Sequence, residues 1–201
     1  GQTWEQVIRQ QLFTPLGMIA TGFGGTGTLG LLDQPWGHLR AGQPVPHNGP
    51  ATDNPPVLGP AGRVHASLQD WARFLTDQLR GAGGQSGFLQ AASYSKLFTA
   101  PADGDYALGW LTANRAWGGG TAYTHAGCNT MNYAVAWLAP HRGFGVFVCI
   151  NQGDDEAAKA ADAAAGALIA LRPDPAEPIG GLNRADIESA TERTAKETHL
   201  R

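Results

Sequence analysis

The sequence has little cysteine, no excess of positive charge and no long apolar run, and each shortage removes a class of function. The two cysteines, Cys128 and Cys149, form neither a CxxC pair nor a metal-ligand spacing, so we predict no metal site and interpret both as small buried residues. Fourteen basic against seventeen acidic residues give a formal charge of -3, which predicts no nucleic-acid partner. No apolar run reaches the roughly 18 residues that a membrane-spanning segment needs.

Several familiar site patterns are absent or misplaced. The nucleophile elbow GxSxG does not occur, which excludes an α/β-hydrolase. Two overlapping GxGxxG matches lie at residues 22–27 and 25–30, but they follow a helical pattern instead of a strand, so we predict no dinucleotide site. Ser93 and Lys96 match SxxK, yet they sit in a short segment between a glycine linker and Pro101. We therefore interpret this match as chance.

Four segments have the patterns of helices. Apolar residues recur at helical spacing over residues 3–12, and Ser67 precedes a second apolar series that Gly81 is expected to end. Residues 88–98 are expected to form a short helix. Asp154 precedes an alanine-rich segment that is helical by composition, and we expect this last helix to pack on the sheet.

The remaining patterns predict an antiparallel sheet and long loops. The strings TAYTHAG, MNYAVAWLAP and GFGVFVCIN read as three strands, with a turn at residues 140–143. Five glycines at residues 22–30 predict a loop, and recurrent prolines at residues 33–60 predict an excursion over the surface. The expected fold class is α+β, with an antiparallel β-sheet flanked by helices and incomplete at the N-terminal side. We expect one domain over residues 1–172 and a peripheral charged tail over 173–201, with a weak helix at 185–196.

His125 stands out among the six histidines. It lies on the first expected strand, and Gly127 follows two residues later on the same face. A glycine there would let a substrate carbonyl approach the backbone, and the following N–H could point at developing negative charge. From these residues alone a structural histidine is the favoured interpretation, and a catalytic histidine is the alternative.

Five sequence strings, taken together and in their order along the chain, favour the catalytic interpretation of His125. They are TWEQVIRQQLFTPLGM, GPAGRVHASLQDWARFL, YALGW, THAG and FVCINQGD. Together they resemble the C-terminal portion of the class C β-lactamase and penicillin-binding-protein-like serine hydrolases, over residues 2–171. In that family YALGW corresponds to a glycine-tryptophan strand, THAG to the third catalytic motif, and FVCINQGD to the last strand.

The resemblance implies roles for individual residues. His125 would replace the lysine of a KTG motif on an edge strand, where that lysine helps to bind the substrate carboxylate. The backbone N–H of Cys128 would be one of two oxyanion-hole donors, a role that needs no thiol. The residues expected to contact substrate are Ala126, Gly127, Asn129 and Thr130, with Asn132 and Tyr133 on the same face and Asn151 at the end of the last strand.

The resemblance also implies an activity and its partners. The parent reaction would be acyl-enzyme formation on an ester, a D-amino-acid peptide or a β-lactam, without a cofactor, in a periplasmic or secreted protein. Histidine at position 125 leans toward an esterase or D-peptidase. The SxxK and YxN motifs would lie in a missing N-terminal half of the same domain, so we expect this chain alone to be inactive, and to be poorly soluble or associated. The alternative is a non-catalytic binding or structural module on the same scaffold.

Overall fold

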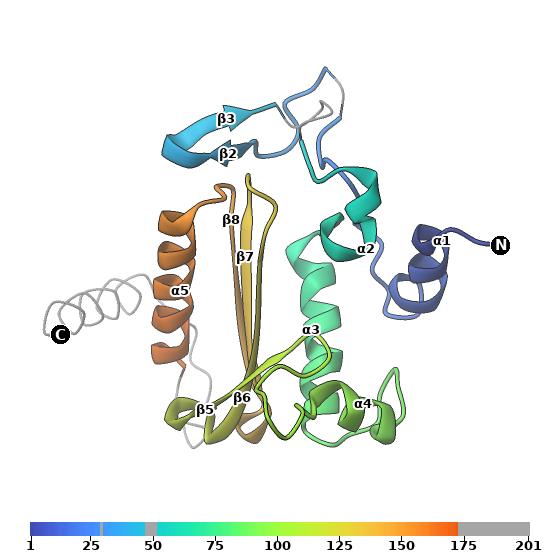
Figure 1. The fold of residues 1–201 in the computed structure, drawn as a ribbon, viewed down its shortest axis with the longest axis vertical. Coiled ribbons are helices and arrows are strands. Elements are labelled where there is room, and N and C mark those ends of the chain that lie inside the picture. The colour runs from blue at the N-terminus through green and yellow to red at the C-terminus, as the bar shows by residue number, and fades with distance from the viewer. Residues whose placement is uncertain (29, 47–51, 173–201) are drawn as a thin grey trace, which may run out of the picture.

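The computed structural model describes residues 1–28, 30–46 and 52–172. At its centre is a four-stranded antiparallel sheet with strand order β5-β6-β7-β8 (Figure 1). The strands are β5 (Leu111–Arg115), β6 (Gly120–Cys128), β7 (Tyr133–Ala139) and β8 (Phe144–Ile150). The expected α+β class, an antiparallel sheet with flanking helices, is confirmed.

The sheet is a meander closed by short turns. Gly119 and Gly143 follow single 3-10 turns and have φ angles of 72° and 65°, a left-handed conformation that glycine adopts without strain. The expected turn at residues 140–143 is therefore present. Strand β5 lies outside the three expected strands, and the YALGW string ends just before it, with only Tyr106 bridging to Leu111.

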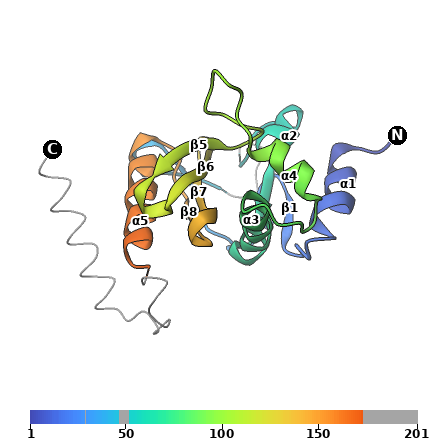
Figure 2. The ribbon, with the colours of Figure 1, turned by 90° about the horizontal axis from the view of Figure 1, so that it is seen from below.

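Two long helices cover opposite faces of this sheet (Figures 1 and 2). Helix α3 (Leu68–Ala82) begins after Ser67, whose Oγ accepts a hydrogen bond from the Asp70 N–H at 3.2 Å, as the N-cap pattern predicts. It continues past the expected end at Gly81. Tyr94 explains the glycine inside the helix, because its ring lies where a Cβ on residue 81 would stand.

Helix α5 (Asp155–Ala170) packs on β7 and β8 through alanine. Its N-cap carboxylate, on Asp154, accepts a hydrogen bond from the Ala157 N–H at 2.8 Å. Ala157, Ala161 and Ala165 are buried and recur every four residues, so they share one face of the helix. The small side chains let the helix approach the sheet closely, and the expected packing of this helix on the sheet is observed.

The main core lies between the sheet, α3 and the shorter helix α4 (Ala91–Phe98). Its buried members are Leu75, Tyr94, Phe98, Trp110, Ala136 and Leu138. The fully buried Tyr94 donates its hydroxyl proton to Asp77 Oδ1 at 2.6 Å. Burial, followed by this hydrogen bond, raises the pKa of Tyr94 above its ordinary value.

Residues 4–23, which include the first helix and the first strand, lie on the far side of α3 from the sheet (Figures 1 and 2). Helix α1 (Trp4–Ile8) continues as a π-helical turn, Arg9–Phe13, in place of one regular helix. The glycine-rich stretch begins with strand β1 (Thr21–Phe23), which pairs with β4 (Val64–Ala66), so the expectation of a continuous loop there is wrong.

The proline-rich excursion also contains regular structure. Strands β2 (Gly37–Leu39) and β3 (Gln43–Val45) form an isolated hairpin, and a 3-10 turn (Pro56–Leu58) leads into the short helix α2 (Gly59–Gly62). A two-stranded hairpin leaves each strand one unpaired side, which is where proline is tolerated. The expected tail and its weak helix lie outside the described residues. None of the described helices has both the length and the apolar character needed to cross a bilayer.

A buried carboxylate joins β1 to α3. Asp70 is 1% exposed and accepts hydrogen bonds from Thr21 Oγ1 at 2.9 Å and from the Ala20 N–H at 2.5 Å. Burial acts to raise the pKa of Asp70, but hydrogen bonds from Thr21, Ala20 and Arg73 outweigh it and hold this pKa below its ordinary value. The carboxylate is therefore ionised in the folded protein and fixes the small β1–β4 sheet on the start of α3.

Candidate active site

Strand β6 changes its surroundings halfway along. Residues 120–124 pair with β5, and the last two of them also pair with β7; Thr124 opposite Leu111 is the last pair with β5. From His125 to Cys128 the strand pairs only with β7, and these four residues are exposed. The resemblance places this motif on an edge strand. The structure shows instead an inner strand of which the C-terminal half alone, within the described chain, is a free sheet edge.

The backbone at this free edge has a defined direction. The Asn129 N–H donates to the Asn132 carbonyl at 3.3 Å, which makes residues 129 and 132 a hydrogen-bonded pair. Such pairs alternate with non-hydrogen-bonded pairs along an antiparallel ladder, so Cys128 opposite Tyr133 belongs to the second kind. The N–H of Cys128 therefore points away from β7, toward the uncovered side of the strand.

The imidazole of His125 is held by contacts at one ring nitrogen, Nδ1. Its Nδ1 lies 2.7 Å from the carbonyl oxygen of Gly109 and 3.4 Å from the hydroxyl oxygen of Tyr106. Both partners belong to the loop that precedes β5. The side chain is exposed and does not pack in the interior.

The turn after Cys128 is held by the side chain of Asn129. Its Oδ1 accepts hydrogen bonds from the Met131 and Asn132 backbone N–H groups at 3.2 and 2.8 Å. Thr130 has a φ of 73°, which is unusual for a residue other than glycine, and its N–H donates to Cys128 Sγ at 3.2 Å. These contacts fix the backbone immediately after the outward-pointing N–H.

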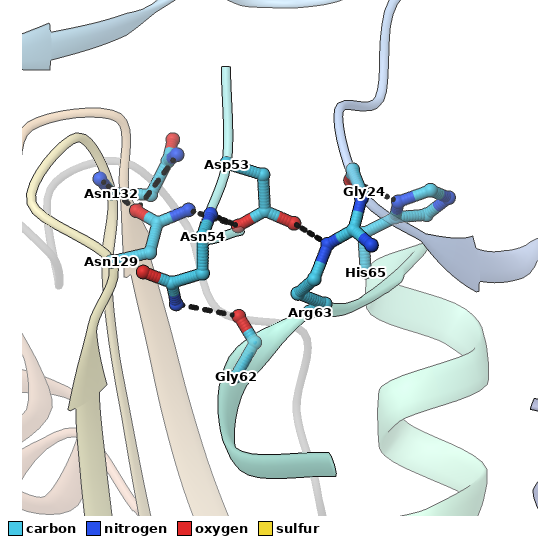
Figure 3. Close-up of polar contacts among 8 residues, drawn as sticks. All are labelled: Gly24, Asp53, Asn54, Gly62, Arg63, His65, Asn129 and Asn132. Carbon is cyan, nitrogen blue, oxygen red and sulfur yellow. Dashed lines mark hydrogen bonds and ion pairs between the residues drawn. The ribbon is translucent and has the colours of Figure 1, made fainter. Parts of the chain in front are cut away.

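The side chain of Asn129 is held in turn by two further polar residues, Asp53 and Arg63 (Figure 3). Its Nδ2 donates to Asp53 Oδ1 at 3.1 Å, and the Asp53 side chain is only 8% exposed. Asp53 Oδ2 lies 3.8 Å from Arg63 Nε, a distance that is an ion pair but too long for a hydrogen bond. The Gly24 N–H donates to the Arg63 carbonyl at 2.8 Å, which links this cluster to the β1–β4 sheet.

The β2–β3 hairpin supports the same turn from another side. The His38 N–H donates to the Met131 carbonyl at 3.0 Å, and the His38 carbonyl accepts from the Gly153 N–H at 3.0 Å. Asn151, which directly follows β8, donates from Nδ2 to the Trp36 carbonyl at 2.8 Å. Residues near 36–38, 53 and 151–153 therefore all form hydrogen bonds at the end of the sheet nearest to the free half of β6.

The structure brings together most of the residues singled out in the sequence. Ala126 and Gly127 lie on the free edge with His125, while Asn129 and Thr130 form the turn beyond it. Asn132 is exposed beside that turn. Burial, followed by the charges of Asp162 and Cys128, raises the pKa of Tyr133 above its ordinary value.

Two other interpretations change. Cys128 and Cys149 are exposed free cysteines, so the expectation that both are buried is wrong. Cys128 lies on the free half of β6, and Cys149 lies on β8, an edge strand of the sheet. Ser93 and Lys96 are exposed on α4, which lies at the opposite end of the sheet from the β2–β3 hairpin (Figure 1). The structure thus separates the SxxK match from the free half of β6.

Sequence reasoning missed the residues that hold the site from a distance. Asp53 lies 76 residues before Asn129, and no local pattern distinguishes it from other loop aspartates. Tyr106 and Gly109 lie within YALGW, a string that the resemblance did single out, although for a strand and not for contacts with His125. Among the described residues, no group of three or more histidine, cysteine, aspartate or glutamate side chains is arranged to hold a metal ion.

Comparison with known proteins gives one extended family match. A family model described as beta-lactamase matches residues 1–171. A search of curated proteins found no match.

Solved structures show the same fold. An octameric penicillin-binding protein homologue from Pyrococcus abyssi is 20% identical with a TM-score of 0.62, and the match covers 84% of this chain and 38% of that one. A penicillin-binding protein from Bacillus halodurans is 20% identical with a TM-score of 0.60, covering 83% and 49%. A D-stereospecific amidohydrolase from Streptomyces sp. is 19% identical with a TM-score of 0.58, covering 80% and 48%. The chain spans less than half the length of each of these structures.

Proposed function

Because the chain belongs to the β-lactamase family of serine hydrolases, we propose that it forms the C-terminal part of an active site that works through an acyl-enzyme. The substrate classes are an ester, a D-amino-acid peptide or a β-lactam, and the first two rank higher because histidine stands in place of the motif lysine. One observation carries the proposal. The half of β6 from His125 to Cys128 is exposed and uncovered on one side, and the Cys128 N–H points to that side.

The geometry fits the needs of acyl transfer. When a nucleophile attacks a carbonyl, the carbonyl oxygen acquires negative charge, which preorganised N–H donors stabilise. The Cys128 N–H would be one of the two donors. Ala126 and Gly127 would line the approach along the strand, and Asn129 and Thr130 would contact the substrate from the turn. Because Gly127 has no side chain, the carbonyl could reach the backbone closely.

In this proposal, the nucleophile comes from another segment of the parent protein. We propose that an N-terminal half of the same domain supplies an SxxK serine and lysine and a YxN tyrosine, and that the parent protein acts in the periplasm or is secreted. The coverage of the solved structures supports this arrangement, since this chain accounts for 38–49% of their length. Reading the frame upstream of residue 1 tests it directly, because SxxK, YxN and an export signal should be encoded there.

We expect a fluorophosphonate or penicillin probe to leave the 201-residue chain unlabelled and to label a longer chain that includes the upstream segment. Loss of a nucleophile costs several powers of ten in rate, so the difference should be all or none on a gel. The measurement is in-gel fluorescence followed by peptide mapping. Ser93→Ala is the matched control and should change nothing; modification mapped to Ser93 in the short chain would contradict the proposal.

We expect the isolated chain to associate. Several apolar side chains are strongly exposed, including Ile19 at 90%, Leu32 at 84% and Leu68 at 56%. Where such side chains form a contiguous patch, a partner normally covers it. Size-exclusion chromatography with light scattering should give a mass above that of one chain, and adding the N-terminal half should restore a one-to-one species. A monomeric chain that melts cooperatively would contradict this part of the proposal.

The competing possibility is a non-catalytic binding or structural module. The observation in its favour is that Ser93 and Lys96, the SxxK match found in this sequence, lie on the exposed surface of α4. An upstream reading frame without SxxK and YxN, together with absence of labelling in every length of chain, would favour the module over the enzyme.

A further inference from the structure

The hydrogen bond between His125 and Gly109 determines which ring nitrogen carries the proton. A backbone carbonyl oxygen can only accept a hydrogen bond, so the Nδ1 atom 2.7 Å away from it must be the donor. The Tyr106 hydroxyl oxygen, at 3.4 Å from the same Nδ1, is a more distant neighbour that can share this proton as a second acceptor. In the neutral imidazole, Nδ1 is therefore protonated.

The other ring nitrogen is consequently an acceptor. A neutral imidazole carries one proton, so with Nδ1 protonated its Nε2 has a free lone pair. Nε2 has no hydrogen-bond partner among the residues that the structure describes, and the side chain is exposed. His125 and Gly127 share one face of β6, and a Cβ placed on Gly127 would meet nothing within 4 Å. In the described part of the chain, the space beside this histidine is therefore open to a ligand.

We infer that His125 offers the substrate an acceptor nitrogen, and that the site takes substrates that place an N–H or O–H donor beside this strand instead of a carboxylate. The inference rests on the proposed function, which puts the substrate along this edge, and it names the substrate class: esters or amides with a neighbouring amine, amide or hydroxyl group. A lysine at this position has the opposite character, because its ammonium carries three donors and no acceptor.

The preference for a donor group over a carboxylate follows from what each would meet at Nε2. A carboxylate next to the Nε2 lone pair brings two acceptors together with no proton between them. It can be bound only if the imidazole first takes a proton from solvent, and the free energy of that protonation is then lost from binding. A donor group pays no such cost, so it should be preferred wherever the imidazole is neutral.

The tautomer can be measured without any enzyme activity. In protein labelled with 15N at histidine, at about pH 8.5, well above the range in which histidine side chains ordinarily titrate, His125 should show a protonated Nδ1 and an unprotonated Nε2. His125→Gln identifies its signals among the six histidines. Tyr106→Phe is the control and should leave the tautomer unchanged, because the Gly109 carbonyl remains. A protonated Nε2, an equal mixture, or a switch of tautomer in Tyr106→Phe would overturn the inference.

Substrate preference is tested in the longer chain that carries the nucleophile. Two matched esters, one with a carboxamide and one with a carboxylate next to the reacting carbonyl, should differ in KM by on the order of tenfold in favour of the carboxamide, the size of one hydrogen bond to a charged or well-placed partner. His125→Lys should reverse the order. Equal KM values, or a carboxylate preference in the unaltered protein, would contradict the inference. If the longer chain has no turnover, the proposed function fails, and the NMR result still decides the tautomer.

Discussion

Gly153→Ala should lower the free energy of unfolding by about 3 kcal/mol, at the upper end of what overpacking a filled site costs. A Cβ at residue 153 would overlap the carbonyl carbon of Thr130 and the nitrogen of Met131, and would stand 2.5 Å from the Thr130 oxygen. All three are backbone atoms of the turn after Cys128, so no flexible side chain can move aside. The Gly153 N–H also donates to the His38 carbonyl, and the same displacement would break that bond.

Gly166→Ala is the matched control for this substitution. Gly166 lies within α5, and a Cβ there meets nothing within 4 Å. Alanine is the better helix former by about 0.5–1 kcal/mol, so this variant should be slightly more stable than the original protein. Urea unfolding at matched protein concentration compares the two. A Gly153→Ala protein that unfolds at the original midpoint would show that the turn does not pack against residue 153 as described.

Asp53→Ala should destabilise the protein by about 3 kcal/mol, the lower end of the range for removing one member of a buried charge pair. The lower end applies because Arg63 keeps 22% of its side chain exposed and stands 3.8 Å away. The substitution also removes the acceptor for Asn129 Nδ2, and Asn129 shapes the turn after Cys128. In a nucleophile-bearing longer chain, kcat should therefore fall with KM little changed, by up to the hundredfold loss typical of a missing oxyanion donor.

Asp53→Asn separates the two contributions. Its amide oxygen can still accept from Asn129, but the charge facing Arg63 is gone, so stability should fall while kcat is largely retained. Asp103→Ala, at an exposed aspartate, should stay within about 0.5 kcal/mol of the original stability. Equal losses of kcat in Asp53→Asn and Asp53→Ala would show that the hydrogen bond to Asn129 does not position the turn.

The parts of the fold that the sequence predicted well have local signals. Ser67 and Asp154 are N-cap residues ahead of recognisable helical segments, and both cap their helices in the structure. The strands β6, β7 and β8 follow apolar or alternating runs. Strand β5 escaped prediction because its five residues, LTANR, are exposed or half-buried and show no alternation. Strand β1 was hidden among glycines, and its partner β4 lies some forty residues later in the chain.

The residues of the candidate site also fall into those with a local sequence signal and those without one. His125 and Gly127 could be found because both lie in one short string with spacing that suits a strand face. The contacts that orient them could not, because they join distant segments. Asp53 reaches Asn129, and Gly109 reaches His125, only after the chain has folded. A lone aspartate in a proline-rich loop carries no sign of burial in its neighbours.

The open space at Gly127 indicates what would constrain the residue type at this position. In the described chain nothing would touch an added methyl group there, and the residue is not in a left-handed conformation that requires glycine. Folding of the described chain therefore does not demand glycine at 127. A side chain at this position would contact only a bound molecule or another segment of the parent protein, so the tolerance of position 127 to substitution measures how closely such a partner approaches the backbone.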